Sequence, residues 1–439
     1  MSSPPPALPP DQPDCDVAIV GGGTAALCAA LAARRKGASV MLLDQAPPDQ
    51  RGGNTRHSRN LRIMHGAPSP LFPGSYDEAD FAADLTKAAE GAENEALAQV
   101  LIRQSATIPG WLAAEGVVFQ TIACGGLPWS RKTAFFLGGG KAMINTLYAT
   151  ATRLGIAIHH HSHVTGLTPD GLVTMCDEAD KARTIRAKAV VVASGGYQAN
   201  PVWLAEQWGD DAAALVVRGT PFAAGEPLRA LFDLGAARVG TPGACHLVAV
   251  DGRLTEADGG IVTRVDGLAQ GIAIDRDGRR FEDETAITGP TRYAQWGRRV
   301  AALPGAIAHA VWDEDGIERT PPAILEPIRA DSLEALAELL DMPLATLAVT
   351  AADSGRVSRA PFFTVPIRPG ITFTCYGVKI DDHARVLTDD GQPLGCLYAA
   401  GMIMAPNVIG TGYLAGAALT IGAVFGRIAG EEAADHALG

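Results

Sequence analysis

Apolar residues are grouped most clearly near the start of the chain. An apolar run at 17–20 leads into Gly21-Gly22-Gly23, an alanine-rich stretch follows at 24–33, and a second apolar run at 40–43 ends at Asp44. Short apolar runs bounded by glycine predict buried parallel strands, and the longer run of small helix-forming residues between them predicts a helix. The stretch 16–44 therefore predicts a strand–helix–strand unit.

The following segments continue this alternation of helices and strands. Apolar residues at helical spacing predict helices within 77–115, and a helix that begins with glycines follows at 138–154. Apolar runs at 156–158 and 189–193 predict further strands. From about residue 201 to 365 the pattern changes to short helices, turns and isolated strands.

The closing segment returns to the first style, which predicts an α/β fold with an inserted second domain. It holds strands at 377–380 and 395–401 and an apolar helix within 407–427. We therefore expect a first domain of residues 14–200 plus 366–439 and an inserted α+β cap domain of residues 201–365. A length of 439 residues, which exceeds one ordinary core, supports two domains. Residues 1–13, rich in proline, are expected to be a disordered tail.

Composition narrows the class of protein. Apolar residues make up 47% and charged residues 19% of the chain, which is typical of a globular protein, and the net charge of −12 argues against a nucleic-acid partner. The start of the chain lacks the regions of a signal peptide, and the most apolar late run is too short to cross a bilayer. We expect a cytoplasmic protein that is not integral to a membrane.

The seven cysteines are scattered and form no Cys-x-x-Cys pair. This spacing excludes a disulfide framework, an attached c-type haem and the usual iron–sulfur motifs. Three of the histidines at 159–163 could share one side of a strand, but no carboxylate or cysteine is near them in sequence. No metal site is therefore expected.

The glycine turn has the spacing of a dinucleotide site. Gly21 permits the tight turn, Gly23 lets a pyrophosphate approach the backbone, and the small Ala26 lets helix and strand pack closely. The N–H groups at the helix start would face the phosphates. Asp44, which stands 23 residues after Gly21, is placed to accept a hydrogen bond from a ribose hydroxyl. The loop at 51–62 then carries four arginines, as expected of a segment that meets anions.

Four motifs, spread over almost the whole chain, resemble the fumarate reductase/succinate dehydrogenase flavoprotein superfamily, whose members bind FAD. They lie at 21–23, 52–55, 278–284 and 399–401. Within that superfamily the segments 51–62, 135–141, 218–221 and 369–374 look most like the FAD-dependent tricarballylate dehydrogenases and the related flavin-type precorrin-3B synthases. The resemblance implies a Rossmann-like FAD-binding domain of the glutathione-reductase type, a cap over the flavin, and hydride transfer between flavin and a substrate carbon.

The resemblance also implies the residues that hold the cofactor. They meet the pyrophosphate, the ribose and the flavin ring, and they are Gly21, Gly22, Gly23, Thr24, Ala25, Asp44, Gln45, Gly52, Gly53, Asn54, Thr55, Ser194, Gly195, Gly196, Gly401 and Met402. His57 stands close to the point where some relatives attach FAD covalently, but the attachment motif is absent, so non-covalent FAD is expected.

The chain departs from the fumarate reductases at positions that handle substrate. Those enzymes carry a histidine pair where this chain has Thr372-Phe373, a substrate-binding arginine where it has Tyr413, and a proton-relaying arginine where it has Ile287. We therefore expect fumarate to be a poor substrate. The first two departures resemble the tricarballylate group, and the tyrosine also resembles that of the 3-ketosteroid dehydrogenases.

Two positions differ from the tricarballylate group itself. That group typically has a glutamate where Met402 stands and an arginine near Gly289, whereas the nearest arginine here is Arg292.

A carboxylate substrate requires positive groups that hold it and stabilise the charge that develops when its α-proton is removed. Arginine can bind a carboxylate through two hydrogen bonds. The arginines that could serve are Arg56, Arg59, Arg62, Arg131, Arg218, Arg292, Arg359 and Arg368. Arg59 and Arg218 are favoured because motif segments surround them, although a structural ion pair is the competing interpretation for each arginine.

The candidate catalytic residues are Tyr413, Arg59, Glu284, Arg292, Arg218, His57 and His246. Glu284 would relay protons or orient substrate, or would form an ion pair with Arg279 or Arg280. Tyr413, expected to open the last helix, would donate a hydrogen bond to substrate or pack in the core. The two histidines would contact flavin or substrate or transfer a proton, or would be structural.

The leading hypothesis is an FAD-dependent dehydrogenase or reductase acting on CH–CH groups. It would introduce or reduce a C=C bond in a small anionic polycarboxylate of the tricarballylate kind, and would pass electrons to a separate acceptor protein or to oxygen. The alternatives are an oxygen-using flavoenzyme of cofactor or natural-product biosynthesis, like the precorrin-3B synthases, a desaturase like the 3-ketosteroid dehydrogenases, and a non-catalytic flavoprotein that carries electrons.

Overall fold

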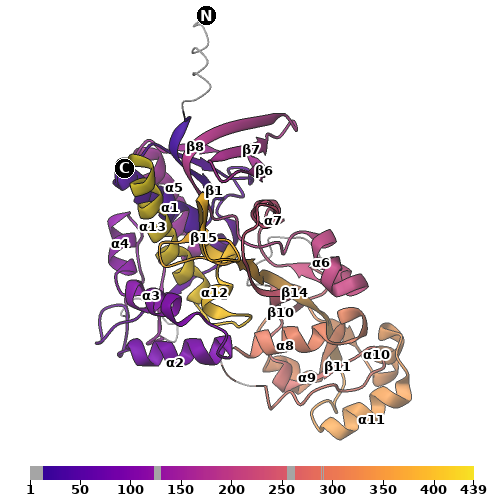
Figure 1. Cartoon of the computed structure of the whole chain (residues 1–439). Helices are drawn as coiled ribbons and strands as arrows, with labels where there is room; N and C mark the ends of the chain where they lie inside the picture. Colours follow the sequence, from indigo (N-terminus) through magenta and orange to yellow (C-terminus); the bar gives the residue numbers. More distant parts are fainter. Residues whose placement is uncertain (1–12, 123–129, 255–262, 288, 290) are drawn as a thin grey trace, which may run out of the picture. The chain divides into compact units, whose positions relative to one another are not determined.

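The computed structural model describes residues 13–122, 130–254, 263–287, 289 and 291–439. Nearly all of the tail expected at 1–13 thus lies outside the described residues. The chain forms two compact units (Figure 1). The first unit is Met1–Tyr197, Phe222–Ala244 and Cys375–Gly439, and the second unit is Gln198–Pro221 and Cys245–Thr374.

The first unit is a mixed sheet with a parallel centre, together with helices. Its elements, in chain order, are β1 (Cys15–Val20), α1 (Thr24–Arg35), β2 (Val40–Leu43), η1 (Gly53–His57), β3 (Asn60–Arg62), α2 (Glu78–Ala89), α3 (Glu95–Ser105), α4 (Ile108–Ala114), β4 (Thr133–Phe135), α5 (Gly139–Arg153), β5 (Ala157–His159), β6 (His163–Leu167), β7 (Leu172–Cys176), β8 (Ala182–Val192), α7 (Glu226–Asp233), β15 (Arg385–Leu387), β16 (Pro393–Ala399), η7 (Gly401–Ile403), α12 (Pro406–Ile409) and α13 (Ala417–Leu438).

The sheet of the first unit runs in the order β15-β16-β8-β1-β2-β5. Strand β1 pairs in parallel with β2 on one side and with β8 on the other, so that Ile19 lies between Leu42 and Val191. All three residues are buried, as expected for the inner strands of a parallel sheet. Because the carboxyl ends of parallel strands meet at one edge, the segments that follow β1, β2 and β8 come together there.

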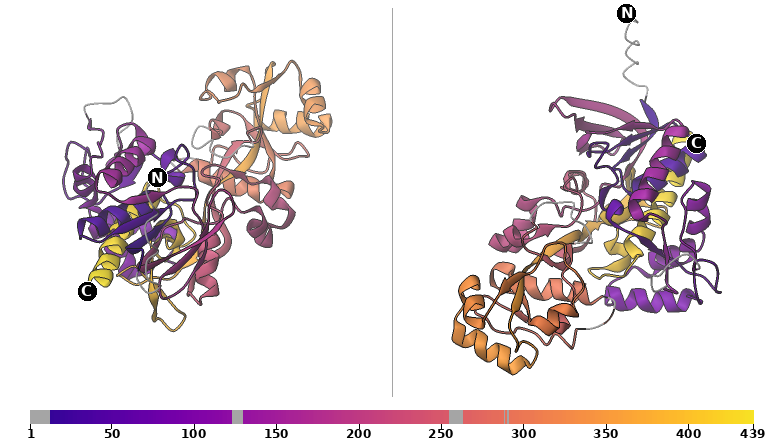
Figure 2. Two further views of the ribbon diagram at one scale, coloured as in Figure 1. Left: turned by 90° about the horizontal axis from the view of Figure 1, so that it is seen from above. Right: turned by 180° about the vertical axis from the view of Figure 1, so that it is seen from behind.

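Helices α1 and α13 pack side by side, and Figures 1 and 2 show them in indigo and yellow. Their contact is close because α13 presents glycines at every fourth position, which lie on one helix face. A Cβ atom at Gly426 would lie 2.5 Å from the carbonyl oxygen of Ala25, and one at Gly430 would overlap the carbonyl oxygen of Ala29. The two backbones therefore touch, and α13 holds the start of α1 in place.

The second unit is a sheet between two layers of helices. It contains α6 (Pro201–Trp208), η3 (Gly209–Ala214), β9 (Val216–Val217), η5 (Leu268–Gln270), β11 (Ile272–Ile274), α8 (Arg292–Ala301), η6 (Pro304–Ala306), β12 (Ala308–Trp312), α9 (Glu314–Glu318), β13 (Ile328–Ala330), α10 (Leu333–Leu340) and α11 (Leu344–Ser354). Two strands, β10 (Arg238–Asp251) and β14 (Phe362–Val378), continue from one unit into the other.

Alternation along the strands places the two helix layers on opposite faces of this sheet, whose order is β10-β14-β12-β11. Ala273 and Ala310 pack in one apolar cluster with Trp296 of α8. Their neighbours Ile272 and Val311 pack in another, which contains residues of α10 and α11.

The α/β fold expected from the sequence is confirmed, and so is the opening strand–helix–strand unit. Several local expectations were wrong. Of the strand expected at 377–380, residues 377–378 are the end of β14, which is 17 residues long, and Ile380 makes an isolated bridge with Val386. The last helix begins at Ala417, so Tyr413 precedes it and does not open it. The segment 159–163 is no single strand, because β5 ends at His159, β6 begins at His163, and His161 lies between them with a φ of +53°.

The division into units also differs from the sequence boundaries. Residues 198–200 and 366–374 fall in the second unit, whereas residues 222–244 fall in the first. This stretch carries α7, which packs against β6 of the first unit. Its short helix and turns resemble those of the insertion, which is why the pattern alone did not separate them.

The packing of α13 on α1 predicts that Gly430→Ala is destabilising. Alanine is the better helix former by about 1 kcal/mol, but its Cβ would overlap the Ala29 carbonyl, and such overpacking costs about 1–3 kcal/mol. Gly110→Ala in the exposed part of α4 is the matched control, because a Cβ there meets nothing within 4 Å. Thermal unfolding followed by circular dichroism should give a lower midpoint for Gly430→Ala only. Equal midpoints for both variants would contradict the backbone contact.

Candidate functional site

The turn between β1 and α1 leaves no space for side chains at its first two glycines. Gly21 has a φ of +120°, and a Cβ there would lie 2.5 Å from the carbonyl oxygen of Ala193. A Cβ at Gly22 would overlap the Asp44 carboxylate. At Gly23 the nearest atoms to a Cβ would be 3.7 Å away, so the protein itself does not require glycine there. The open space beside Gly23 fits a pyrophosphate that lies against the backbone.

The start of α1 is open to a ligand. Its N-cap residue is Gly23, which has no side chain to cap the helix. The N–H of Thr24 donates to Oγ1 of Thr55 at 3.1 Å, and the two hydroxyls lie 2.8 Å apart. The N–H groups of Ala25 and Ala26 belong to the first turn, where no preceding carbonyl is available to them. Together with the helix dipole they favour an anion.

Asp44 follows β2 directly and is buried. Its Oδ2 lies 2.9 Å from the Tyr148 hydroxyl, and its Oδ1 accepts a hydrogen bond from the N–H of Ala46 at 3.2 Å. Burial raises the pKa of the Asp44 carboxyl above its ordinary value, and both hydrogen bonds oppose this rise. A carboxylate has further lone pairs beyond these two contacts, so Asp44 can still accept from ribose hydroxyls.

The segment 52–58 is clamped beside the glycine turn by the start of α5. Gly52 has a φ of +103°, and a Cβ there would lie 2.6 Å from Cγ2 of Ile144. The N–H of Gly140 donates to the carbonyl of Ser58 at 2.7 Å, and a Cβ at Gly140 would overlap the carbonyl of Thr55. The glycine-rich start of α5 therefore allows this loop to approach closely.

The glycine turn, Asp44 and the segment 52–58 form a cradle, which two further segments complete. Ser194 follows β8, and its buried Oγ has no hydrogen-bond partner among the described residues. A Cβ at Gly401, which follows β16, would lie 2.8 Å from Cβ of Ala25 at the start of α1. The structure thus brings the predicted cofactor residues at 21–25, 44–45, 52–55, 194–196 and 401–402 into one unit. A cradle where side chains are excluded and a buried hydroxyl lacks a partner fits FAD.

Two residues of this cradle were absent from the predicted set. Tyr148 lies on α5, where no motif marks it, and its role becomes visible only through its contact with Asp44. Arg51 belongs to the arginine-rich loop, and its guanidinium carbon lies 4.7 Å from the centroid of the Tyr148 ring. Within the described residues the buried Nε of Arg51 has no hydrogen-bond partner, which leaves one donor for an anion.

In the second unit, a buried arginine and a buried histidine lie beside β14. Nη1 of Arg218 donates to Oγ1 of Thr372 at 3.1 Å, and its backbone N–H donates to Ile371 at 2.9 Å. His246 of β10 stacks on Phe373, with ring centroids 5.1 Å apart. Burial lowers the pKa of His246 well below its ordinary value, and the charges of Arg218 and Arg298 lower it further. The imidazole is therefore neutral at neutral pH.

Glu284 is fully buried and held by several donors. It accepts hydrogen bonds from the N–H of Ala273 at 2.8 Å, from Arg280 at 2.5 Å and from Arg356 at 2.7 Å. The ion pair with Arg280 that the sequence offered as the alternative to a proton relay is thus present. Ile287, where fumarate reductases have their relay arginine, packs in the apolar cluster around Trp296.

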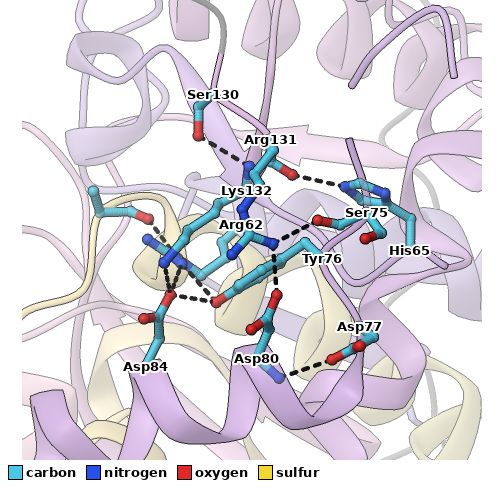
Figure 3. A network of polar contacts seen from close by, with 11 residues as sticks. Arg62, His65, Ser75, Tyr76, Asp77, Asp80, Asp84, Ser130, Arg131 and Lys132 are labelled. Carbon is cyan, nitrogen blue, oxygen red and sulfur yellow. Dashed lines mark hydrogen bonds and ion pairs between the residues drawn. The ribbon is translucent and has the colours of Figure 1, made fainter. Parts of the chain in front are cut away.

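Arg62 has a structural role (Figure 3). Its Nη1 lies 2.6 Å from the Tyr76 hydroxyl and 2.9 Å from Oδ2 of Asp84, which also binds Lys132. Its Nε donates to the carbonyl of Ala415 at 3.0 Å. Arg62 therefore ties β3 to α2 and to the segment before α13.

Of the other arginines of the candidate set, Arg56 and Arg368 are partly buried, and the remaining four are exposed or partly exposed. Exposed or half-exposed ion pairs occupy Arg131 with Asp80, Arg292 with Asp266, and Arg359 with Glu314 and Asp315. Arg59 is exposed, has no ion pair within the described residues, and lies with its guanidinium carbon 5.8 Å from the centroid of the Phe135 ring.

The remaining candidates, His57 and Tyr413, are partly buried in the first unit. His57 ends η1, and Tyr413 lies four residues before α13.

In the part of the chain that is described, no group of three or more His, Cys, Asp or Glu side chains could hold a metal ion. None of the helices described there is long and apolar enough to cross a membrane.

The open space at Gly23 predicts a specific loss of cofactor in Gly23→Val. The valine methyls would occupy the place where the pyrophosphate approaches the backbone, whereas a Cβ at this position has ordinary contacts within the protein. Purified Gly23→Val should be folded but carry almost no FAD, as measured by absorbance near 450 nm (roughly, for oxidised flavin) and by circular dichroism. Gly66→Val, on an exposed bend where a Cβ meets nothing within 4 Å, should keep its FAD. Full flavin content in Gly23→Val would rule out this assignment.

Comparison with known proteins supports the assignment of this cradle to FAD. The FAD binding domain family matches residues 16–419. The probable fumarate reductase Ifc3 of Shewanella frigidimarina is 28% identical over 433 residues, which cover 91% of this chain and 71% of that protein. The NADH:fumarate oxidoreductase of Klebsiella pneumoniae is 26% identical over 97% of this chain. The chain spans only 48% of the length of that relative.

A solved structure shows the same architecture. The open conformation of a flavocytochrome c3 fumarate reductase superposes with a TM-score of 0.76 and 25% sequence identity, over 97% of this chain and 79% of that one. With the family match over most of the chain, these likenesses place the protein in the fumarate reductase/succinate dehydrogenase flavoprotein superfamily. The chain belongs to the FAD binding domain family and is an FAD-dependent oxidoreductase.

Proposed function

We propose that this protein interconverts a CH–CH bond and a C=C bond in a small polycarboxylate, and that a compound of the tricarballylate kind is its substrate. The observation that carries the proposal is the buried arginine Arg218, beside the neutral His246 and the hydroxyl of Thr372. A desolvated guanidinium with neighbouring neutral donors suits a carboxylate better than it suits a neutral substrate. The relatives are named as fumarate reductases, which supports a small dicarboxylate or tricarboxylate as the substrate.

The residues of the second unit favour a substrate other than fumarate. The segment 372–373 supplies a hydroxyl and a phenyl ring where fumarate reductases carry two histidines. Ile287 is 4% exposed within an apolar cluster, so it cannot take part in proton transfer. We therefore assign a substrate carboxylate to Arg218, a buried cation of the second unit.

Each group would have a defined task in the reaction. Bound FAD supplies hydride chemistry at a substrate carbon. Arg218 would grip one carboxylate through its planar fork and so stabilise negative charge on the adjacent carbon. His246, being neutral, would donate one hydrogen bond without adding charge. Glu284, whose oxygens are taken by Arg280 and Arg356, would hold the fold of the second unit and not move protons.

We also propose that FAD is held without a covalent bond and that electrons pass to a separate acceptor. His57, close to the point of covalent attachment in some relatives, ends a short 3₁₀ helix in a segment that lacks the attachment motif. The scattered cysteines, which form no Cys-x-x-Cys pair, motivate the separate acceptor.

This proposal predicts that Arg218→Ala loses turnover and keeps its cofactor. Losing a charge-assisted pair with a carboxylate costs about 2 kcal/mol, so kcat/KM for tricarballylate with a dye acceptor should fall about thirtyfold or more. The matched control in the same unit is Arg359→Ala, which removes a 61% exposed arginine and should leave kcat/KM within about twofold.

Flavin content and the melting curve separate this effect from misfolding. An Arg218→Ala protein that is fully loaded with FAD and turns over tricarballylate like the wild type would contradict the assignment of Arg218. If neither the wild type nor Arg359→Ala oxidises any polycarboxylate, the substrate class itself is wrong.

A further inference from the structure

A buried tyrosine joins the glycine turn to the acid that follows β2. Tyr148 of α5 is 3% exposed, and its hydroxyl lies 2.9 Å from Oδ2 of Asp44 and 3.1 Å from the carbonyl oxygen of Gly22. Burial and the neighbouring carboxylate raise the pKa of the phenol, so it stays protonated and donates. A side chain at Gly22 would overlap both the carboxylate and the hydroxyl. The three groups therefore meet at one point.

The groups that face the Asp44 carboxylate come from three segments. Tyr148 approaches from α5, His160 from the turn after β5, and Arg51 from the arginine-rich loop. Nδ1 of His160 lies 4.0 Å from Oδ2 of Asp44 but only 3.1 Å from the carbonyl of Ala46, to which it donates. Burial lowers the pKa of His160. Arg51 acts only through its charge, since its guanidinium stacks on the Tyr148 ring.

This arrangement makes the charge of Asp44 depend on the tyrosine. A carboxylate that is 6% exposed has lost most of its hydration, which favours the protonated form. The hydrogen bond from the Tyr148 hydroxyl favours the ionised form. Only the ionised carboxylate is a pure acceptor, as two ribose hydroxyls require, whereas a protonated one would present a donor to them. Tyr148 thus acts on the cofactor site through the Asp44 carboxylate.

We propose that Tyr148 is a positioning residue that fixes the Asp44 carboxylate and keeps it ionised, and that this contact sets the pH range over which the protein retains FAD. The inference needs FAD and the assignment of Asp44 to the ribose. It does not depend on the substrate that we propose for the enzyme.

The test is the release of FAD from the purified, flavin-bound full chain. Wild type and Tyr148→Phe are diluted into buffers from about pH 5 to about pH 9, and free FAD is measured by its fluorescence. Phenylalanine keeps the ring on which Arg51 stacks and removes only the hydroxyl. Without this donor the pKa of Asp44 rises, so the carboxylate takes up its proton at a higher pH. The midpoint of acid-induced FAD release should therefore move up by about one pH unit.

The two ends of the pH range distinguish this role from a merely structural one. Below the midpoints, FAD should bind about tenfold more weakly to Tyr148→Phe, and near pH 9 the two dissociation constants should agree within about threefold. A control is Tyr398→Phe, because Tyr398 lies on β16, which β8 and β1 separate from β2 in the sheet. This variant should release FAD like the wild type. An unchanged midpoint, or equal weakening at every pH, would overturn the proposal.

Asp44→Asn keeps the proposal testable even if Tyr148→Phe does not fold. The amide cannot titrate, so this variant should bind FAD more weakly, and its release should be nearly independent of pH over the same range. Circular dichroism on each sample identifies acid unfolding of the chain, which would release FAD for a different reason. Acid-induced release from a folded Asp44→Asn protein, with the midpoint of the wild type, would show that another group controls retention.

Discussion

The close approach of three backbone segments at the ends of β1, β2 and β8 is the constraint on which the first unit depends. Gly21 turns with a positive φ against Ala193, and Gly22 lies where any side chain would overlap Asp44. Glycine has no Cβ, so the turn after β1 can lie directly against the segments that follow β2 and β8. The same turn lets α1 begin at this edge of the sheet. The glycines of α13 also permit a close backbone contact, since they bring that helix against the backbone of α1.

The second unit buries a positively charged side chain and a histidine. Arg218, which directly follows β9, is 9% exposed, and His246 on β10 is 4% exposed. Thr372 gives the guanidinium a hydrogen bond, while the imidazole stays neutral against the Phe373 ring. We assigned Arg218 to a substrate carboxylate because its guanidinium is buried, whereas Arg280 and Arg356 are paired with the Glu284 carboxylate.

The sequence predicted the α/β fold because local patterns determine it: apolar runs, glycines at fixed spacing and an acid after the second strand. It could not predict contacts between distant segments. Nothing in the neighbourhood of Tyr148 marks it as the partner of Asp44, which is 104 residues away in the chain. The same limit applies to Arg62, which looked like an anion ligand and is in fact held by Asp84 and Tyr76. The start of the last helix was misplaced because the glycines at 410–416 do not show by themselves where helical hydrogen bonding begins.

The proposed activity is tested most directly by the colour of the flavin under anaerobic conditions. Tricarballylate added to the oxidised protein should bleach the flavin absorbance, because the substrate would hand its hydride to FAD. Fumarate added to the chemically reduced protein should restore the absorbance at least about thirtyfold more slowly than the unsaturated product of tricarballylate, since Tyr413, Ile287 and 372–373 replace the groups that handle fumarate. Rapid reoxidation by fumarate, with no response to tricarballylate, would contradict the proposal.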